Sequence, residues 1–121
     1  MKNEHAVAAL AALAQDSRLA IFRMLVQAGL EGVSAGGIRE SLGMAPATLS
    51  FHLKELVHAG LVKSTQEGKF VFYRAQFDQM NALIAYLLEH CCEGHPEGCG
   101  MDGLECKPEQ AKSRRTVTDR A

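Results

Sequence analysis

The 121-residue sequence predicts a mainly α-helical domain with one β-hairpin, arranged as a winged helix-turn-helix. Three observations indicate this class. Apolar residues recur at helical spacing over most of the first 60 positions. Two of these helical segments, both short, meet at a tight turn through Gly43. The hydrophobic period then changes to two between Val62 and Ala75, as in paired strands.

The first two helices are predicted from apolar spacing in an alanine-rich background. Residues 4 to 14 are expected to form a helix with an apolar face made of Val7, Leu10, Leu13 and Ala14. Asp16 is expected to cap a second helix that ends near Gly29. The apolar face of this second helix is expected to comprise Leu19, Phe22, Leu25 and Val26.

The third and fourth helices are predicted from their end signals. A short helix begins at Ser34, places Ile38 and Leu42 inward and stops at Gly43. Pro46 suits the first turn of the next helix, and Gly60 suits the position just past its end. Its buried stripe is expected to be Leu49, Leu53, Leu56 and Val57. Its remaining surface then consists of Thr48, Ser50, Phe51, His52, Lys54 and Glu55.

The second half of the chain begins with the hairpin, whose turn is expected at Glu67 and Gly68. A last helix is expected from about Phe77 to the break at Gly94 and Pro96. Its apolar positions are too many for one small domain to cover, which predicts a partner-facing helix: Met80, Leu83, Ile84, Leu87 and Leu88.

Composition excludes some classes and leaves others open. Thirteen basic against fourteen acidic residues give a formal charge of -1, so any affinity for nucleic acid must come from local patches. The chain has no apolar run of about 20 residues, the length that spans a bilayer. We expect a cytoplasmic protein, where clustered thiols are more often metal or redox sites than disulfides.

Three stretches resemble the ArsR/SmtB family of bacterial repressors. Residues 10–25, LAALAQDSRLAIFRML, resemble its second-helix signature, and residues 47–62, ATLSFHLKELVHAGLV, closely match its recognition helix. Residues 68–74, GKFVFYR, are similar to its wing. The resemblance implies a homodimer, joined through the first and last helices, that represses its operon until a metal or metalloid binds. Residues 1–92 would form the DNA-binding and dimerisation domain, and residues 93–121 a cysteine-containing loop and disordered basic tail.

All four cysteines lie between residues 91 and 106. The third-helix region, residues 34–42, lacks the Cys-x-Cys pair of typical arsenic sensors, and Asp78-Gln79-Met80 lacks the Asp-x-His of the typical zinc site. The chain resembles instead the atypical arsenic-responsive members with a vicinal cysteine pair and a third cysteine after the last helix. That resemblance implies As(III) or Sb(III), as inducer, on Cys91, Cys92 and Cys99.

Other readings of this segment stay open. Cys106 is a candidate fourth ligand, a spare thiol or a second-site thiol, and His90 and His95 are either ligands or surface groups near a helix end. Thiolates are soft ligands, which suits zinc, cadmium and lead as well as arsenic. Thiol oxidation is a further trigger, although five nearby acids and no Lys or Arg between residues 89 and 105 disfavour reactive thiolates. A thiol enzyme or metal carrier is opposed because the chain lacks Cys-x-x-Cys and any evident nucleophile-base set, so we predict no enzyme.

The predicted DNA-binding residues lie on the fourth helix and the wing. Side chains on the outer face of the helix contact bases or phosphates, and basic groups add phosphate contacts. The set comprises Ala47, Thr48, Ser50, Phe51, His52, Lys54, Lys69 and Arg74. A twofold dimer implies a double-stranded, inverted-repeat operator with half-sites about 34 Å, or a multiple of that, apart.

Overall fold

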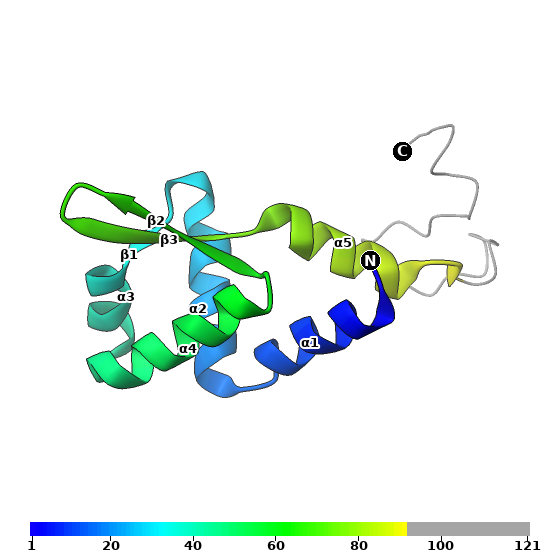
Figure 1. The fold of residues 1–121 in the computed structure, drawn as a ribbon, viewed down its shortest axis with the longest axis horizontal. Helices are drawn as coiled ribbons and strands as arrows, with labels where there is room; N and C mark the ends of the chain where they lie inside the picture. Colours follow the sequence, from blue (N-terminus) through cyan, green and yellow to red (C-terminus); the bar gives the residue numbers. More distant parts are fainter. Residues whose placement is uncertain (92–121) are drawn as a thin grey trace. The chain divides into compact units, whose positions relative to one another are not determined.

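This computed structural model describes residues 1–91 and confirms the predicted class, mainly helical with a β-hairpin (Figure 1). Its elements are, in order, α1 (Asn3–Leu13), α2 (Asp16–Ala28), the 3₁₀ turn η1 (Gly29–Glu31), β1 (Val33–Ser34), α3 (Ala35–Leu42), α4 (Pro46–His58), β2 (Val62–Glu67), β3 (Phe70–Ala75) and α5 (Phe77–Leu88).

Helix ends are set by local chemistry, mostly at the predicted residues. The Ser34 hydroxyl accepts a hydrogen bond from the Gly37 backbone N–H at 3.0 Å, which caps α3. Gly43 ends that helix in the left-handed region, with φ 66° and ψ 32°, and Pro46 opens α4. The prediction for α2 was wrong: Gln15 is the cap, because its side chain accepts from the Arg18 N–H at 2.9 Å, and Asp16 is already helical.

The hairpin belongs to a three-stranded antiparallel sheet in the order β1-β3-β2. Residues Val62–Glu67 pair with Phe70–Ala75, so the turn lies at Gly68 and Lys69, one residue later than predicted. The sequence did not predict β1, in which Val33 pairs with Tyr73 and Ser34 with Phe72. Two residues are too few for periodicity to reveal a strand.

The core lies between the helices and the sheet. Its fully buried side chains are Ile21, Leu25, Ile38, Leu56, Leu61 and Val62. Two predicted core positions are wrong: Leu19 is 44% exposed and Val57 is 38% exposed, while Ile21 and His52 are turned inward instead. The helical faces are rotated by about one position from those expected, since only apolar residues were counted toward the buried stripe.

Helix α1 also turns a different face inward than its sequence predicted. Ala6, Ala9 and Ala12 are buried, whereas Val7 and Leu10 are 56% and 43% exposed. α1 contacts both α2 and α4. Alanines at a spacing of three residues let a helix backbone approach its neighbours closely, which explains why the larger side chains point outward.

The chain divides into two compact units, Met1–Leu83 and Ile84–Ala121, with the division inside α5. The first unit contains the whole helix-turn-helix and hairpin. In the second, residues 84–91 are described, and there Ile84 is 43% and Leu87 56% exposed, whereas Leu83 in the first is buried. The predicted domain boundary at residues 92 and 93 lies outside the described residues. Among residues 1–91, no helix has the length and apolar character needed to cross a membrane.

Candidate DNA interface

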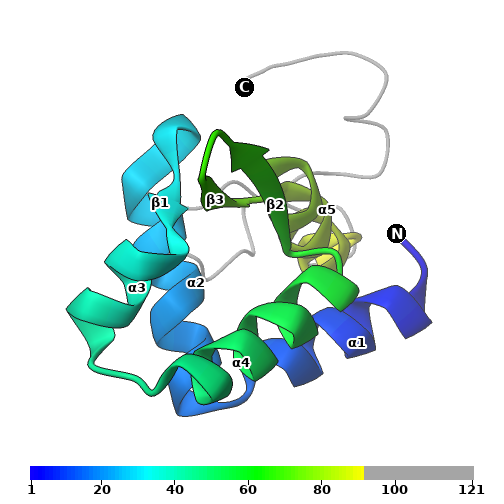
Figure 2. The ribbon, with the colours of Figure 1, turned by 60° about the vertical axis from the view of Figure 1, so that its left-hand side comes forward.

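The outer face of α4 is built by the helix period. Leu49, Leu53 and Leu56 are buried on one side, which fixes the rotation of the helix about its axis. The opposite side is exposed and carries five of the residues predicted to contact DNA: Ala47, Thr48, Ser50, Phe51 and Lys54. In Figure 2 a short turn joins α3 to α4 and leaves this second helix at the edge of the first unit. A row of small hydroxyls, a ring and a lysine is suited to a groove of DNA.

His52 does not lie on this face, and its predicted surface position was wrong. The side chain is 8% exposed and sits with the leucines on the inner side of α4. Its Nδ1 lies 3.2 Å from Nη1 of Arg18 in α2. Position 52 falls in the i, i+3, i+4, i+7 series that begins at Leu49, so the helix period places it inward although histidine is polar. Its ring also contacts the Phe51 ring edge-on, with centroids 5.5 Å apart.

The wing presents Lys69 in an exposed turn next to Phe70, whose side chain is 63% exposed. In Figure 1 the hairpin tip, α3 and the first turn of α4 lie at the same end of the first unit. A duplex that follows α4 can therefore meet the hairpin tip as well, which is the geometry of winged helix-turn-helix recognition.

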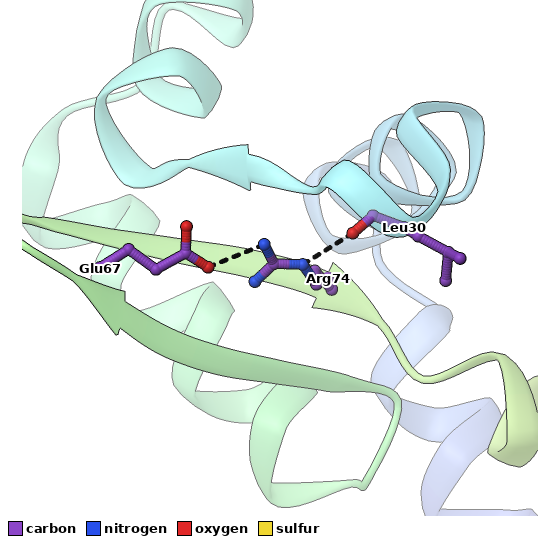
Figure 3. A network of polar contacts seen from close by, with 3 residues as sticks. All are labelled: Leu30, Glu67 and Arg74. Atoms are coloured by element: carbon purple, nitrogen blue, oxygen red, sulfur yellow. Dashed lines mark hydrogen bonds and ion pairs between the residues drawn. The ribbon is translucent and has the colours of Figure 1, made fainter.

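Arg74, predicted as a phosphate contact, is instead engaged within the protein (Figure 3). Its Nε donates to the Leu30 carbonyl oxygen at 2.8 Å, and its Nη2 lies 2.8 Å from Oε2 of Glu67. The guanidinium also lies 5.8 Å from the centroid of the Phe72 ring. Arg74 thus ties β3 to η1 and to the end of β2, so its role in the structure is to orient the wing.

Two exposed basic residues were missed by the sequence reading, Arg39 on α3 and Lys63 on β2. Lys63 pairs with Arg74 in the hairpin register and follows the buried Val62, so the alternation of the strand was the signal that places it outward. Arg39 lies on the first helix of the pair, the element that crosses the DNA backbone in such modules. Both residues add positive charge to the surface that carries Lys54 and Lys69.

The predicted cysteine site falls almost entirely outside the described residues. Cys91 is described and half-buried, and His90, next to it, has a positive φ of 61°. Cys92, His95, Cys99 and Cys106 lie beyond residue 91. Within residues 1–91 no group of three or more His, Cys, Asp or Glu side chains is arranged to hold a metal ion. The ligand set therefore stays a prediction.

Comparison with known proteins gives consistent results. A family model described as a helix-turn-helix domain matches residues 13–65. The HTH-type transcriptional regulator YgaV of Escherichia coli K12 is 33% identical over 89 residues, which cover 74% of this chain and 88% of the relative.

Two solved structures are similar in fold and sequence. An ArsR-like transcriptional regulator from Rhodococcus sp. RHA1 has a TM-score of 0.62 and 27% identity, covering 69% of this chain and 76% of that one. The homodimeric winged helix-turn-helix DNA-binding domain of Mb0332 from Mycobacterium bovis, described as a possible ArsR-family regulator, has a TM-score of 0.58 and 29% identity. That match covers 76% of this chain and 85% of the other.

Proposed function

This chain belongs to the ArsR family of winged helix-turn-helix transcriptional regulators, and we propose that it is a cytoplasmic repressor that binds inverted-repeat operator DNA as a homodimer. The outer face of α4 carries the proposal. Thr48, Ser50 and Phe51 are exposed there on a helix held rigidly by its buried leucines. Hydroxyls pair with base edges or phosphates, and an apolar ring packs on a thymine methyl group.

A homodimer is proposed because apolar side chains stay exposed on two helices. Val7 and Leu10 of α1 and Ile84 and Leu87 of α5 are each at least 43% exposed in the single chain. Burial of such side chains against a second copy is favourable, at about 25 cal/mol per Å² of apolar surface. The similar Mb0332 domain is itself described as homodimeric.

The DNA proposal is tested by selecting binding sequences from a random duplex library with the purified protein. The selected sites are expected to be inverted repeats with half-site centres about one or two helical turns apart. Enrichment of no sequence, or of single half-sites bound by monomers, would contradict the proposal.

Variants then separate base contacts from phosphate contacts. Ser50→Ala and Phe51→Ala are expected to lower discrimination between the selected site and mismatched sites by about 1–3 kcal/mol per contact. Lys69→Ala is expected to weaken all sequences alike and to reduce the salt slope of binding by about 0.9. Lys2→Ala, an exposed lysine at the N-terminus, is the matched control and should leave both quantities unchanged.

We further propose that As(III) or Sb(III) binds Cys91, Cys92 and Cys99 and releases the DNA. The supporting observation is the concentration of all four cysteines between residues 91 and 106, directly after α5. Soft thiolates select soft ions, and three of them suffice for a pyramidal site on a trivalent metalloid. Release requires the ligand to bind the DNA-free conformation more tightly, typically by 1–3 kcal/mol in coupling free energy, roughly.

Release of labelled operator DNA by arsenite, followed by fluorescence anisotropy, tests this ligand. Cys91→Ser, Cys92→Ser and Cys99→Ser are expected to abolish release and to keep DNA binding, and Cys106→Ser reports whether a fourth thiol takes part. Parallel titrations with antimonite, zinc, cadmium, lead and peroxide identify the competing triggers. Unaltered release by arsenite in all four variants would reject the site.

A further inference from the structure

Arg18 lies in the first turn of α2, where its charge is unfavourable for its own helix. The N-terminus of a helix carries partial positive charge and favours acidic rather than basic side chains. The backbone N–H of Arg18 is already satisfied by the Gln15 side chain, so the guanidinium has no role in capping. Its position must be explained by contacts with other elements.

Those contacts join the last turn of α1 to the middle of α4. The Nε of Arg18 donates to the Ala12 carbonyl oxygen at 2.7 Å, and Nη1 lies 3.2 Å from Nδ1 of His52. Ala12 is in the last turn of α1, where carbonyl groups lack helical partners and a cation is favourable. One half-buried side chain therefore connects three helices.

The chemistry of the pair fixes the roles of the two residues. A guanidinium has five donors and no acceptor, so Nδ1 of His52 must be the unprotonated ring nitrogen and Nε2 must carry the proton. Arginine stays charged in proteins, and His52 is 8% exposed, so the hydrogen bond is charge-assisted and shielded from water. Such a bond is stronger and more directional than one between neutral surface groups.

We propose that Arg18 is a positioning residue for DNA recognition, and this proposal rests on the proposed function. Through His52 it holds α4 in a fixed orientation relative to α1, the helix whose exposed Val7 and Leu10 we assign to the dimer interface. The separation of the two recognition faces in a dimer then depends on this connection. Arg18 itself makes no contact with DNA.

Two pairs of variants test the role through the affinity for a selected operator, measured by anisotropy. Arg18→Met keeps the side-chain stem and removes the guanidinium, and His52→Leu removes the acceptor. Each is expected to weaken binding by about tenfold or more, since each breaks a hydrogen bond to a charged group. His52→Asn places an amide oxygen near the position of Nδ1, and it is expected to stay within about threefold of the wild type.

The double variant Arg18→Met/His52→Leu distinguishes a shared role from two separate ones. A shared contact predicts a loss close to that of the more damaging single variant, whereas independent contacts predict the product of the two losses. The salt slope is expected to be unchanged in Arg18→Met, because a lost phosphate contact would reduce it by about 0.9. Multiplied losses, or a reduced slope, would overturn the proposal.

Stability and assembly are measured beside affinity, by urea unfolding and sedimentation. Unchanged affinity in Arg18→Met and His52→Leu, at protein concentrations where both are folded dimers, would show a purely structural contact and reject the positioning role. The failure of the proposed function looks different: the wild type itself would then bind no duplex. In that case a coupling between Arg18 and His52 in the unfolding cycle would show that the connection exists and that only its link to DNA is wrong.

Discussion

Gly32 is the residue at which backbone and side chain constrain each other most strongly. Its φ is +74°, and an added Cβ would lie 2.6 Å from Cγ of Arg74 and 2.7 Å from the Tyr73 carbonyl oxygen. The close carbonyl is backbone and cannot move aside. Glycine is therefore required here for Arg74 to reach Leu30 and Glu67, and the orientation of the wing depends on a residue outside it.

Gly32→Ala is expected to lower the free energy of unfolding by about 2–4 kcal/mol, from left-handed strain and overpacking together. Urea unfolding measures the loss. Gly36→Ala is the control, because Gly36 is helical, exposed and has open space around its Cα. There alanine is expected to raise the free energy of unfolding by about 0.5 kcal/mol through higher helix propensity. Equal effects at the two sites would contradict this account of Gly32.

His52 and Arg74 show what the sequence predicts at single positions and what it does not. The exposed Thr48, Ser50 and Phe51 were predicted, because the helix period and the neighbouring leucines are local information. The partners of His52 and Arg74 lie 34 and 44 residues away in the chain, in α2 and η1. No local pattern shows such partners, so both side chains were predicted to face solvent by their polarity alone.

Helix α1 depends on small side chains along one face. Ala9 is 2% exposed, and the face on which it lies contacts α2 and α4. Ala9→Leu is expected to lower the free energy of unfolding by about 1–3 kcal/mol, because extra methyl groups force a close-packed contact apart. Ala8→Leu, on the exposed side of the same helix, is expected to change it by less than about 0.5 kcal/mol. Similar losses in the two variants, measured in urea, would show that α1 packs loosely.

The elements themselves were largely predictable, and the exceptions have physical reasons. The ends of α3 were predicted because Ser34 and Gly43 act on their own helix. β1 was missed because its pairing with Tyr73 and Phe72 is long-range and only two residues long. The buried face of α1 was also missed, since hydrophobicity ranks Val7 and Leu10 above alanine while close helix packing favours the smaller residue.

At the scale of the whole molecule, DNA recognition requires two copies of the chain at a fixed separation. An inverted-repeat operator presents two equivalent half-sites, and a single α4 reads one of them. Leu10 on α1 is exposed in the single chain, next to Val7 on the same helix. A charge at position 10 would be buried without a partner in the proposed interface, which costs several kcal/mol, roughly, while the monomer would keep it in water.

Leu10→Glu is therefore expected to give folded monomers, with native helix content by circular dichroism and a halved mass in sedimentation equilibrium. Its operator affinity is expected to fall by about a hundredfold or more as the second half-site contact is lost. Leu19→Glu is a closely matched control: Leu19 is 44% exposed, Leu10 is 43% exposed, and Leu19 lies on α2, outside the proposed interface. A dimeric Leu10→Glu protein, or equal dissociation of both variants, would show that α1 does not join the subunits.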